Sequence, residues 1–300
     1  MEKIYNELKK RDARNDIINI GLVGCGQMGS GMVKIAKQSP GMEITAIADL
    51  NIERAVTALQ EVGYQKQQIK ECNNQQKAQK YLEEGNVIVT EDAFLLSKIP
   101  ALDSLIEATG STEVGASVAY QSILQGKHII MLNVETDVTV GWILKRMADQ
   151  AGVVYTASAG DEPGAVMEIY RFVKTMGFKV VSIGKGKNNP VNFYASPDDV
   201  REEALSKNMN PKMLCAFVDG TKTMVEMAEV SNATGALPDI PGMHGAEVEI
   251  SELASKYIPQ KDGGLFANDF VVDYSTGKVS PGVFVNFFTD SAALRNWFYC

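Results

Sequence analysis

Apolar and polar stretches alternate regularly through the first half of the chain. The most apolar stretches are expected to form strands at 17–23, 43–48, 87–90, 102–107, 128–132 and 153–156, and the stretches between them to form helices at 1–16, 27–38, 51–61, 112–125 and 138–150. Strands that alternate with helices predict a parallel, doubly wound sheet. The pattern therefore predicts an α/β fold class for this part of the chain.

The alternation is interrupted twice. Residues 63–85 are rich in Gln, Lys and Asn, which predicts a polar, solvated helical insertion without a chemical role. After Gly160, longer spacings and glycine-rich loops replace the alternation, and 283–288 is expected to be a strand, with a return to a central sheet as one arrangement. A chain of 300 residues fits two domains. The expected domains are 1–159, which carries the insertion, and 160–300.

The first expected strand leads directly into a glycine-rich turn. Gly24 permits a tight turn, Gly26 lets the backbone come close to a diphosphate, and Gly29 lets the next helix pack on the strand. Gln27 and Met28 lie between these glycines, at the expected start of that helix, whose free N–H groups favour phosphate. The turn predicts binding of NAD or NADP, and the alternative is a glycine-rich turn without cofactor.

An acid closes the second expected strand. Asp49 lies about 20 residues after the last glycine of the turn, where a ribose-binding carboxylate is expected. A carboxylate at this position repels the 2′-phosphate of NADP and favours NAD. Arg54 lies one turn into the next expected helix and is expected to point elsewhere.

Ligands of open α/β sheets bind beyond the carboxyl ends of the strands. The small residues Ala108, Thr109 and Gly110 follow one strand and are expected to lie beside the nicotinamide ribose. Asn133 follows the next strand and is a candidate partner of the nicotinamide. The alternative for Asn133 is a helix or turn cap.

Overall composition narrows the function classes. The formal net charge of −8 argues against general nucleic-acid binding. No apolar run reaches the length of a membrane span, and the amino-terminal residues lack the apolar core of a signal peptide, so a cytoplasmic protein is expected. The four cysteines show neither a metal-ligand spacing nor a disulfide framework, and Cys25 is expected to be a small filler residue. No metal is indicated, although carboxylates brought together by folding would suit a divalent ion.

Two polar segments of the second half are candidates for the chemistry. The segment 184–190 follows an expected strand at 179–183, and its Lys185, Lys187, Asn188 and Asn189 suit an anionic substrate, with a solvated turn as the alternative.

A helix over 217–226 is expected to place Asp219, Lys222, Thr223 and Glu226 on one face. A lysine near carboxylates there suits an acid, a base or an alkoxide stabiliser, and the alternative is an exposed salt-bridged face.

Three further residues have open roles. Asp161 is expected to cap a helix that begins near Pro163, whereas Glu162 is either a cap or a substrate contact. His244 lies in a loop with two glycines and is a candidate substrate-binding residue.

Several of these segments together resemble a known family. They are Gly21-Leu-Val-Gly-Cys-Gly-Gln-Met-Gly29, Glu107-Ala-Thr-Gly110, Asn133-Val-Glu-Thr-Asp137, Ala159-Gly-Asp-Glu-Pro-Gly164, Gly184-Lys-Gly-Lys-Asn-Asn-Pro190, Asn210-Pro-Lys-Met-Leu214 and Val218-Asp-Gly-Thr-Lys-Thr-Met-Val-Glu-Met-Ala228. The chain resembles the homoserine-dehydrogenase-like NAD(P)-dependent oxidoreductases over roughly 17–290, and within them the 1-deoxy-D-xylulose 5-phosphate reductoisomerase-like branch. The fold implied is a Rossmann doubly wound parallel sheet with a second α+β domain for substrate and oligomerisation.

The resemblance implies hydride transfer between a nicotinamide cofactor and a small anionic sugar phosphate or sugar acid, in the metabolism of sugars or isoprenoid precursors. Lys185, Asp219, Lys222 and Glu226 are then the expected catalytic residues. The branch uses NADPH, whereas Asp49 favours NAD. No nucleic acid or membrane is expected as a partner. A homodimer or higher homo-oligomer is expected because the apolar end at 296–300 needs cover.

Two departures from the family pattern remain. Leu132-Asn133-Val134 lacks the lysine that follows the asparagine in homoserine dehydrogenases, and the chain ends before the C-terminal SAF domain of the closer branch. Homoserine dehydrogenase and a non-catalytic dinucleotide-binding sensor remain as alternatives.

Overall fold

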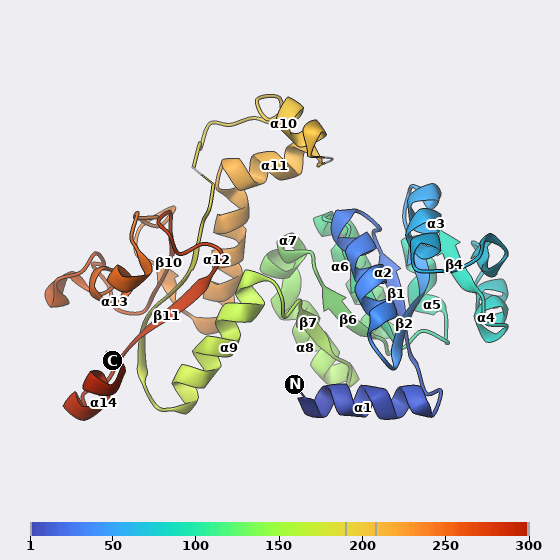
Figure 1. Cartoon of the computed structure of the whole chain (residues 1–300), viewed down its shortest axis with the longest axis horizontal. Helices are drawn as coiled ribbons and strands as arrows, with labels where there is room; N and C mark the ends of the chain where they lie inside the picture. The colour runs from blue at the N-terminus through green and yellow to red at the C-terminus, as the bar shows by residue number, and fades with distance from the viewer. Residues whose placement is uncertain (1, 190, 208, 299–300) are drawn as a thin grey trace. The chain divides into compact units, whose positions relative to one another are not determined.

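The computed structural model describes residues 2–189, 191–207 and 209–298 and forms two compact units, Met1–Ser158 and Ala159–Cys300 (Figure 1). The first unit is built on a seven-stranded sheet in the order β3-β4-β2-β1-β5-β6-β7. Its strands are β1 Ile18–Val23, β2 Met42–Ala48, β3 Ile69–Glu71, β4 Val87–Thr90, β5 Ser104–Glu107, β6 His128–Met131 and β7 Tyr155–Ala157. Every pairing is parallel, which confirms the predicted doubly wound sheet.

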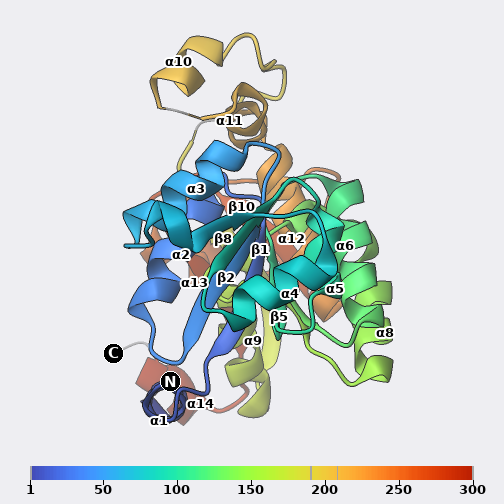
Figure 2. The ribbon, with the colours of Figure 1, turned by 90° about the vertical axis from the view of Figure 1, so that its right-hand side faces the viewer.

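Helices cover both faces of this sheet. The helices of the first unit are α1 Glu2–Ala13, α2 Gln27–Gln38, α3 Ile52–Glu61, α4 Gln75–Glu83, α5 Ala93–Lys98, α6 Thr112–Leu124, α7 Val134–Thr136 and α8 Trp142–Ala151, with the short turns η1 Lys66–Gln68 and η2 Asp137–Gly141. Helix α1 buries no residue and lies outside both faces. Apolar residues of α2 and α3 pack on one face, and those of α4, α5, α6 and α8 pack on the other (Figure 2). This two-sided burial explains why the central strands are apolar at consecutive positions.

The polar segment 63–85 differs from the prediction. It contains η1, strand β3 and α4, and β3 pairs with β4 to form the edge of the sheet. An edge strand of three residues with no fully buried side chain needs little apolar sequence, so composition alone indicated only a solvated insertion. Buried Cys72 and Ala78 attach the segment to the core.

The second unit is built on a four-stranded mixed sheet in the order β11-β8-β10-β9. Its strands are β8 Lys179–Gly186, β9 Leu237–Pro238, β10 Val271–Ser275 and β11 Val283–Phe288. Strand β10 runs parallel to β8 and β9, and β11 runs antiparallel to β8. The strand predicted at 283–288 is therefore confirmed, and it joins this sheet rather than the larger one.

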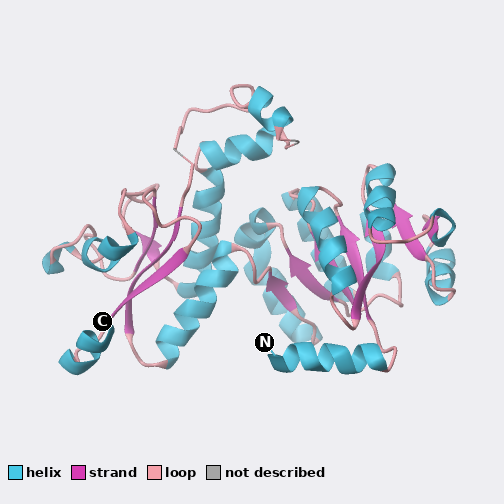
Figure 3. Cartoon of the chain, viewed as in Figure 1, coloured by secondary structure: helices cyan, strands magenta, loops and turns pink. Residues whose placement is uncertain are grey.

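The helices of the second unit are α9 Glu162–Thr175, α10 Arg201–Ser206, α11 Pro211–Val218, α12 Thr221–Thr234, α13 Leu253–Lys256 and α14 Ala292–Phe298, with the turns η3 Ile250–Glu252 and η4 Gln260–Asp262. The two long helices, α9 and α12, cover one face of the mixed sheet (Figure 3). Val166 of α9 and Met227 of α12 pack against Ile183 of β8, whereas Tyr257 and Phe266 belong to a separate cluster.

Strand β8 is longer than predicted. It continues through Gly184, Lys185 and Gly186, which the sequence placed in a loop. A Cβ at Gly184 would lie 2.1 Å from the Asp273 carbonyl oxygen, and one at Gly186 would lie 2.3 Å from the Ser280 nitrogen. These glycines therefore permit close packing of neighbouring backbone rather than forming a turn.

The helix predicted over 217–226 is wrong as one element. Gly220 has a φ of +88° and separates α11 from α12. Asp219 lies in the turn and its Oδ1 accepts a hydrogen bond from the Thr221 nitrogen at 2.7 Å. Asp219 therefore does not share a helical face with Glu226.

The apolar chain end is partly outside the described residues, because 299–300 are not described. In the described part, the Trp297 residue of α14 is 80% exposed. Among the described residues, none of the helices combines the length and the apolar character that crossing a bilayer requires.

Candidate functional site

The glycine turn of the first unit has the geometry that its sequence predicts. Gly24 follows β1 with a φ of +91°, and a Cβ there would lie 2.8 Å from the Ala108 backbone. A Cβ at Gly29 would lie 2.0 Å from the Gly24 carbonyl oxygen, so only glycine lets α2 approach the turn this closely. These two positions shape the turn itself.

Gly26 has a different environment. A Cβ at this position would meet no atom within 4 Å, and no side chain caps the first turn of α2. The loop lies at the carboxyl end of β1, with β2 on one side and β5 on the other, where the strand order reverses. Open backbone, free helical N–H groups and the switch point together fit the diphosphate of a dinucleotide.

Asp49 is integrated into this turn. Its Oδ2 accepts a hydrogen bond from the Cys25 nitrogen at 2.6 Å, and its Oδ1 accepts one from the Asn51 nitrogen at 2.7 Å. Arg54 Nη1 lies 3.8 Å from Asp49 Oδ2, so the prediction that Arg54 points elsewhere is wrong. The carboxylate lies beside the glycine turn and orders it through these hydrogen bonds, a structural role that the sequence did not indicate.

Cys25 has the small structural role expected of it. The residue is fully buried, and burial raises the pKa of its thiol to about 11. A thiol of this kind is a poor nucleophile.

Asn133 is occupied by contacts within the first unit. Its Oδ1 accepts a hydrogen bond from the Thr136 nitrogen at 3.1 Å, and its Nδ2 donates one to the Ser111 carbonyl oxygen at 3.0 Å. Asn133 is therefore the N-terminal cap of helix α7, which is the alternative role that the sequence offered. Ala108 continues the sheet through a hydrogen bond from its nitrogen to the Val23 carbonyl oxygen at 2.8 Å.

A cluster of charged side chains, of which Lys185 and Glu226 are buried, lies in the second unit. Lys185 Nζ forms ion pairs with Glu226 and, at 2.8 Å, with Glu162 Oε1. Asp161 completes this group, because ligand oxygens of Asp161, Glu162 and Glu226 all lie within 4.8 Å of one another. We call these four residues the Lys185 cluster. Glu162 therefore points to Lys185, and Asp161 also caps α9 by accepting a hydrogen bond from the Glu162 nitrogen.

The members of the Lys185 cluster hold their protons differently. Burial, with the hydrogen bond to Glu162, raises the pKa of Asp161 to about 6 against the opposing charge of Lys222. Burial also raises the pKa of Glu226, and the Lys185 charge only partly offsets it. For Lys185, burial disfavours the ammonium, but Glu226 and Glu162 prevail and raise its pKa. Lys185 is therefore a fixed cation, and the raised pKa of about 6 makes Asp161 a candidate for proton exchange near neutral pH.

The same three carboxylates have a spacing that would suit a metal ion. The ammonium group of Lys185 contacts two of them and supplies positive charge at that place.

The other polar residues at the end of β8, Lys187, Asn188 and Asn189, differ in burial and do not form one cluster. Lys187 is buried and donates a hydrogen bond from Nζ to the Phe217 carbonyl oxygen at 2.5 Å. Burial and the Lys185 charge lower the pKa of Lys187. Asn188 is exposed and Asn189 is half-buried, whereas Pro190 of the same motif lies outside the described residues.

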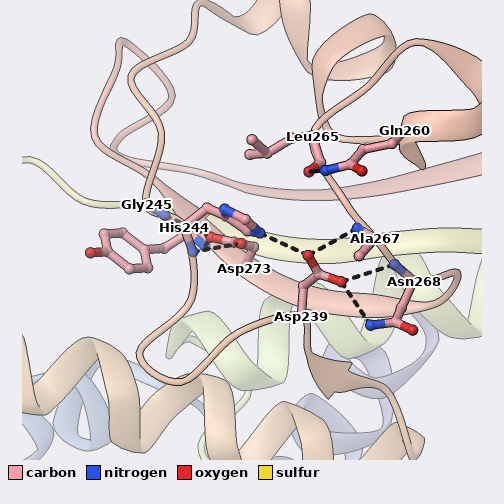
Figure 4. A network of polar contacts seen from close by, with 9 residues as sticks. Asp239, His244, Gly245, Gln260, Leu265, Ala267, Asn268 and Asp273 are labelled. Carbon is pink, nitrogen blue, oxygen red and sulfur yellow. Dashed lines mark hydrogen bonds and ion pairs between the residues drawn. The ribbon is translucent and has the colours of Figure 1, made fainter.

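His244 belongs to another polar network (Figure 4). Its Nε2 lies 2.9 Å from Asp239 Oδ2, and Asp239 also accepts hydrogen bonds from the Ala267 and Asn268 nitrogens. The backbone nitrogens of His244 and Gly245 donate to the buried Asp273 carboxylate at 2.9 Å. This network joins the loop before His244 to the 267–268 turn and to Asp273 of β10.

The unit that holds the Lys185 cluster also gives the family match. Residues 160–299 match the family model described as Oxidoreductase DRL, catalytic domain. A segment of 125 residues, 39% of the chain, is 27% identical to homoserine dehydrogenase from Methylobacillus glycogenes and covers 24% of that protein. The chain thus spans about a quarter of the curated relative that it matches.

Solved structures give weaker likenesses. A probable dehydrogenase from Thermotoga maritima is 14% identical with a TM-score of 0.46, over 90% of this chain and 76% of the other. UDP-N-acetylglucosamine 3-dehydrogenase from Acidithiobacillus ferrooxidans is 15% identical with a TM-score of 0.44, over 73% and 57%. The WlbA dehydrogenase from Bordetella pertussis is 17% identical with a TM-score of 0.40, over 59% and 48%.

Proposed function

We propose that the protein is an NAD(P)-dependent oxidoreductase that acts on a CH–OH or carbonyl group of a small anionic sugar phosphate or sugar acid. The observation that carries this proposal is the open backbone at Gly26, at the switch point of a parallel sheet. The match of residues 160–299 to the catalytic domain of an oxidoreductase supports it independently.

The first unit is proposed to hold the dinucleotide. The nitrogens at the start of α2, together with Gly24, Gly26 and Gly29, are the groups for its diphosphate, and Asp49 is the group for its adenosine ribose. Ala108, Thr109 and Gly110 form a wall of small residues after β5. When bound, the nicotinamide supplies or accepts the hydride.

The Lys185 cluster is proposed to manage charge and protons on the substrate. When a carbonyl is reduced, its oxygen gains negative charge, and a fixed ammonium such as Lys185 stabilises that charge. The oxygen then takes a proton from protonated Asp161, and in the reverse oxidation the Asp161 carboxylate accepts the proton from the alcohol. Glu226 holds Lys185 in place, and Lys222 stabilises the ionised form of Asp161.

Anion binding is proposed for the residues beyond β8. The ammonium of Lys187 donates to the Phe217 carbonyl oxygen, and an ammonium has three donors in all. Asn188 and Asn189 add amide donors next to it. Phosphate or carboxylate groups are the ligands that such donors suit.

Within this class we propose a reductoisomerase that acts on a ketose phosphate such as 1-deoxy-D-xylulose 5-phosphate. The support is the resemblance of the motifs, from Glu107-Ala-Thr-Gly110 to the segment 218–228.

We also propose that the chain works as a homodimer or higher homo-oligomer, because Trp297 leaves a large apolar surface open. Light scattering of the purified protein tests this state directly.

The test of activity uses the full chain with NADH or NADPH and a panel of ketose phosphates, sugar acids and homoserine. We expect oxidation of NAD(P)H, measured by nicotinamide absorbance, with an anionic sugar. We expect Lys185→Ala to abolish turnover and Lys179→Ala, an exposed lysine of the same strand, to retain it. Turnover that survives Lys185→Ala combined with Lys222→Ala would refute the proposed site, and nucleotide binding without turnover on any substrate would favour a sensor.

Homoserine dehydrogenase is the second candidate, favoured by the 27% identity over 125 residues. Turnover of homoserine with NAD or NADP, in the absence of activity on sugar phosphates, would establish it in place of the first proposal.

A further inference from the structure

Glu107 occupies an unusual place for a charged residue. It is the last residue of β5, lies between Val23 of β1 and Met131 of β6 in the sheet, and is 0% exposed. The proposed chemistry assigns no task to its side chain. A fully buried carboxyl at the ligand edge of a parallel sheet needs a physical explanation.

The two carboxyl oxygens of Glu107 have different surroundings. Oε1 accepts a hydrogen bond from the Thr109 nitrogen at 3.0 Å and so fixes the turn that follows β5. Oε2 is buried and makes no hydrogen bond of good geometry. An ionised carboxylate accepts hydrogen bonds at both oxygens, so this arrangement leaves one charged oxygen uncompensated.

Gly115 of α6 shows what surrounds Oε2. A Cβ at Gly115 would lie 2.9 Å from Glu107 Oε2, 2.8 Å from Asn133 Nδ2 and 2.4 Å from Thr136 Oγ1. The side chains of Glu107, Asn133 and Thr136 therefore meet beside Gly115, in a space that a larger residue at this position would fill. Thr136 Oγ1 donates its own hydrogen to the Thr112 carbonyl oxygen at 3.1 Å, which leaves its lone pairs able to accept one.

The charges near Glu107 do not favour its ionised form. Within the described residues, no ion pair reaches Glu107, and the charged side chain that acts on it is the acid Glu135. Burial raises the pKa of Glu107, and the nearby polar groups of Thr109 and Asn133 offset this only in part.

We propose that Glu107 is kept as a neutral carboxylic acid whose carbonyl oxygen positions the Ala108–Gly110 turn against the glycine turn. Oε1 holds the Thr109 nitrogen, and the protonated Oε2 becomes a donor toward Thr136. The Ala108 backbone lies directly beside Gly24, so the position of this turn also sets the room at the glycine turn. A neutral acid there adds no negative charge against a diphosphate. The inference rests on the proposed dinucleotide binding, for which Glu107 is a positioning residue.

The test compares the native chain with Glu107→Gln, Glu107→Ala and the control Glu113→Gln, an exposed acid of α6. Glutamine keeps a carbonyl for the Thr109 nitrogen and a donor at the other position, whereas alanine removes both. Infrared spectra at neutral pH are expected to show a protonated carboxyl band that disappears in Glu107→Gln and persists in Glu113→Gln. Absence of that band from the native protein would overturn the inference.

Two further readouts test positioning. Amide hydrogen exchange at 109–110 is expected to stay slow in Glu107→Gln and to become faster in Glu107→Ala. The NADH dissociation constant is expected to change by less than about twofold in Glu107→Gln and to rise about tenfold in Glu107→Ala, since a lost buried hydrogen bond costs about one factor of ten. Equal losses in both variants would show that the charge is needed and would refute the inference. Native protein that binds neither NADH nor NADPH would refute the proposed function, while the infrared band and the exchange rates still decide the state of Glu107.

Discussion

Lys185 of β8 and Glu226 of α12 form an ion pair in which both side chains are almost fully buried, 8% and 3% exposed respectively. Glu162 of α9 contacts the same ammonium group, so one lysine joins a strand to both helices that cover it. Buried ion pairs of this kind seldom add stability over a well-packed apolar core, whereas removing one partner is costly. The pair therefore points to a chemical use of the charge, and it makes the cluster sensitive to single substitutions.

Lys185→Met tests the energetic side of this pair. Methionine keeps most of the length of the side chain but leaves Glu226 buried without its cation, so we expect the free energy of unfolding to fall by about 3–5 kcal/mol. Urea denaturation measures the change. Adding Glu226→Gln to Lys185→Met is expected to recover part of the loss, because the uncompensated charge is removed.

The matched control is Lys179→Met on the same strand. The Lys179 side chain is 63% exposed, so its change in unfolding free energy is expected to stay within about 0.5 kcal/mol. Equal losses for Lys179→Met and Lys185→Met would contradict the special role of the buried pair.

Asp161 predicts opposite pH dependences for the two directions of the reaction. Reduction needs its protonated form, so the rate is expected to fall as the pH rises through about 6, the raised pKa of Asp161. Oxidation needs the carboxylate, so its rate is expected to rise over the same range. Asp161→Asn is expected to lower both rates by about 100-fold and to remove this pH dependence. A profile that Asp161→Asn leaves unchanged would assign the proton transfer to another group.

Asp49 predicts the cofactor preference. Its carboxylate lies at the glycine turn and would repel a 2′-phosphate, so we expect native protein to bind NADH more tightly than NADPH. Asp49→Asn is expected to shift the ratio of the two dissociation constants about tenfold toward NADPH. Glu53→Gln, an exposed acid in the first turn of α3, is the control. If both variants gave the native ratio, Asp49 would have a structural task alone.

Asp239 predicts a loss of stability in acid. Burial alone would raise its pKa, but the hydrogen bonds from His244, Ala267 and Asn268 prevail and lower the pKa to about 2. The unfolded carboxyl titrates near pKa ~3.9, so the stability that these bonds contribute is complete above that pH and is lost as the pH falls toward about 2. Asp239→Asn is expected to lower the melting temperature at neutral pH and to flatten this acid dependence. A variant whose melting temperature matches the native protein at neutral pH would show that the network contributes little.

Much of the first unit was predictable because its determinants are local. The apolar strands and the turn from Gly24 to Gly29 are each specified within a few residues, and the structure has them where the sequence indicates. Strand β3 was missed because an edge strand requires few apolar residues. The extension of β8 was missed because its glycines are explained by contacts that are distant in sequence. Gly184 packs against the backbone of Asp273, and Gly186 packs against the backbone of Ser280.

The composition of the Lys185 cluster was predictable only in part. Lys185 and Glu226 were both candidates, but their pairing spans 41 positions and Glu162 lies 23 positions before Lys185. No spacing rule links residues on a strand and two separate helices. The spacing over 217–226 fits one helical face that includes Asp219, but a glycine after an aspartate is also a signal for a turn, and Gly220 ends that face.

The central claim is that the open backbone at Gly26 receives the diphosphate of a dinucleotide. The most direct measurement is calorimetric titration of NADH and NADPH into native protein, Gly26→Ala and Gly31→Ala. A Cβ at either glycine meets no protein atom within 4 Å, so both variants are expected to fold, but only the one at Gly26 enters the space proposed for the ligand. We predict that native protein and Gly31→Ala bind a dinucleotide with similar affinity and that Gly26→Ala binds it about tenfold or more weakly. Native protein that binds neither nucleotide, or Gly26→Ala that binds as native protein does, would contradict the account.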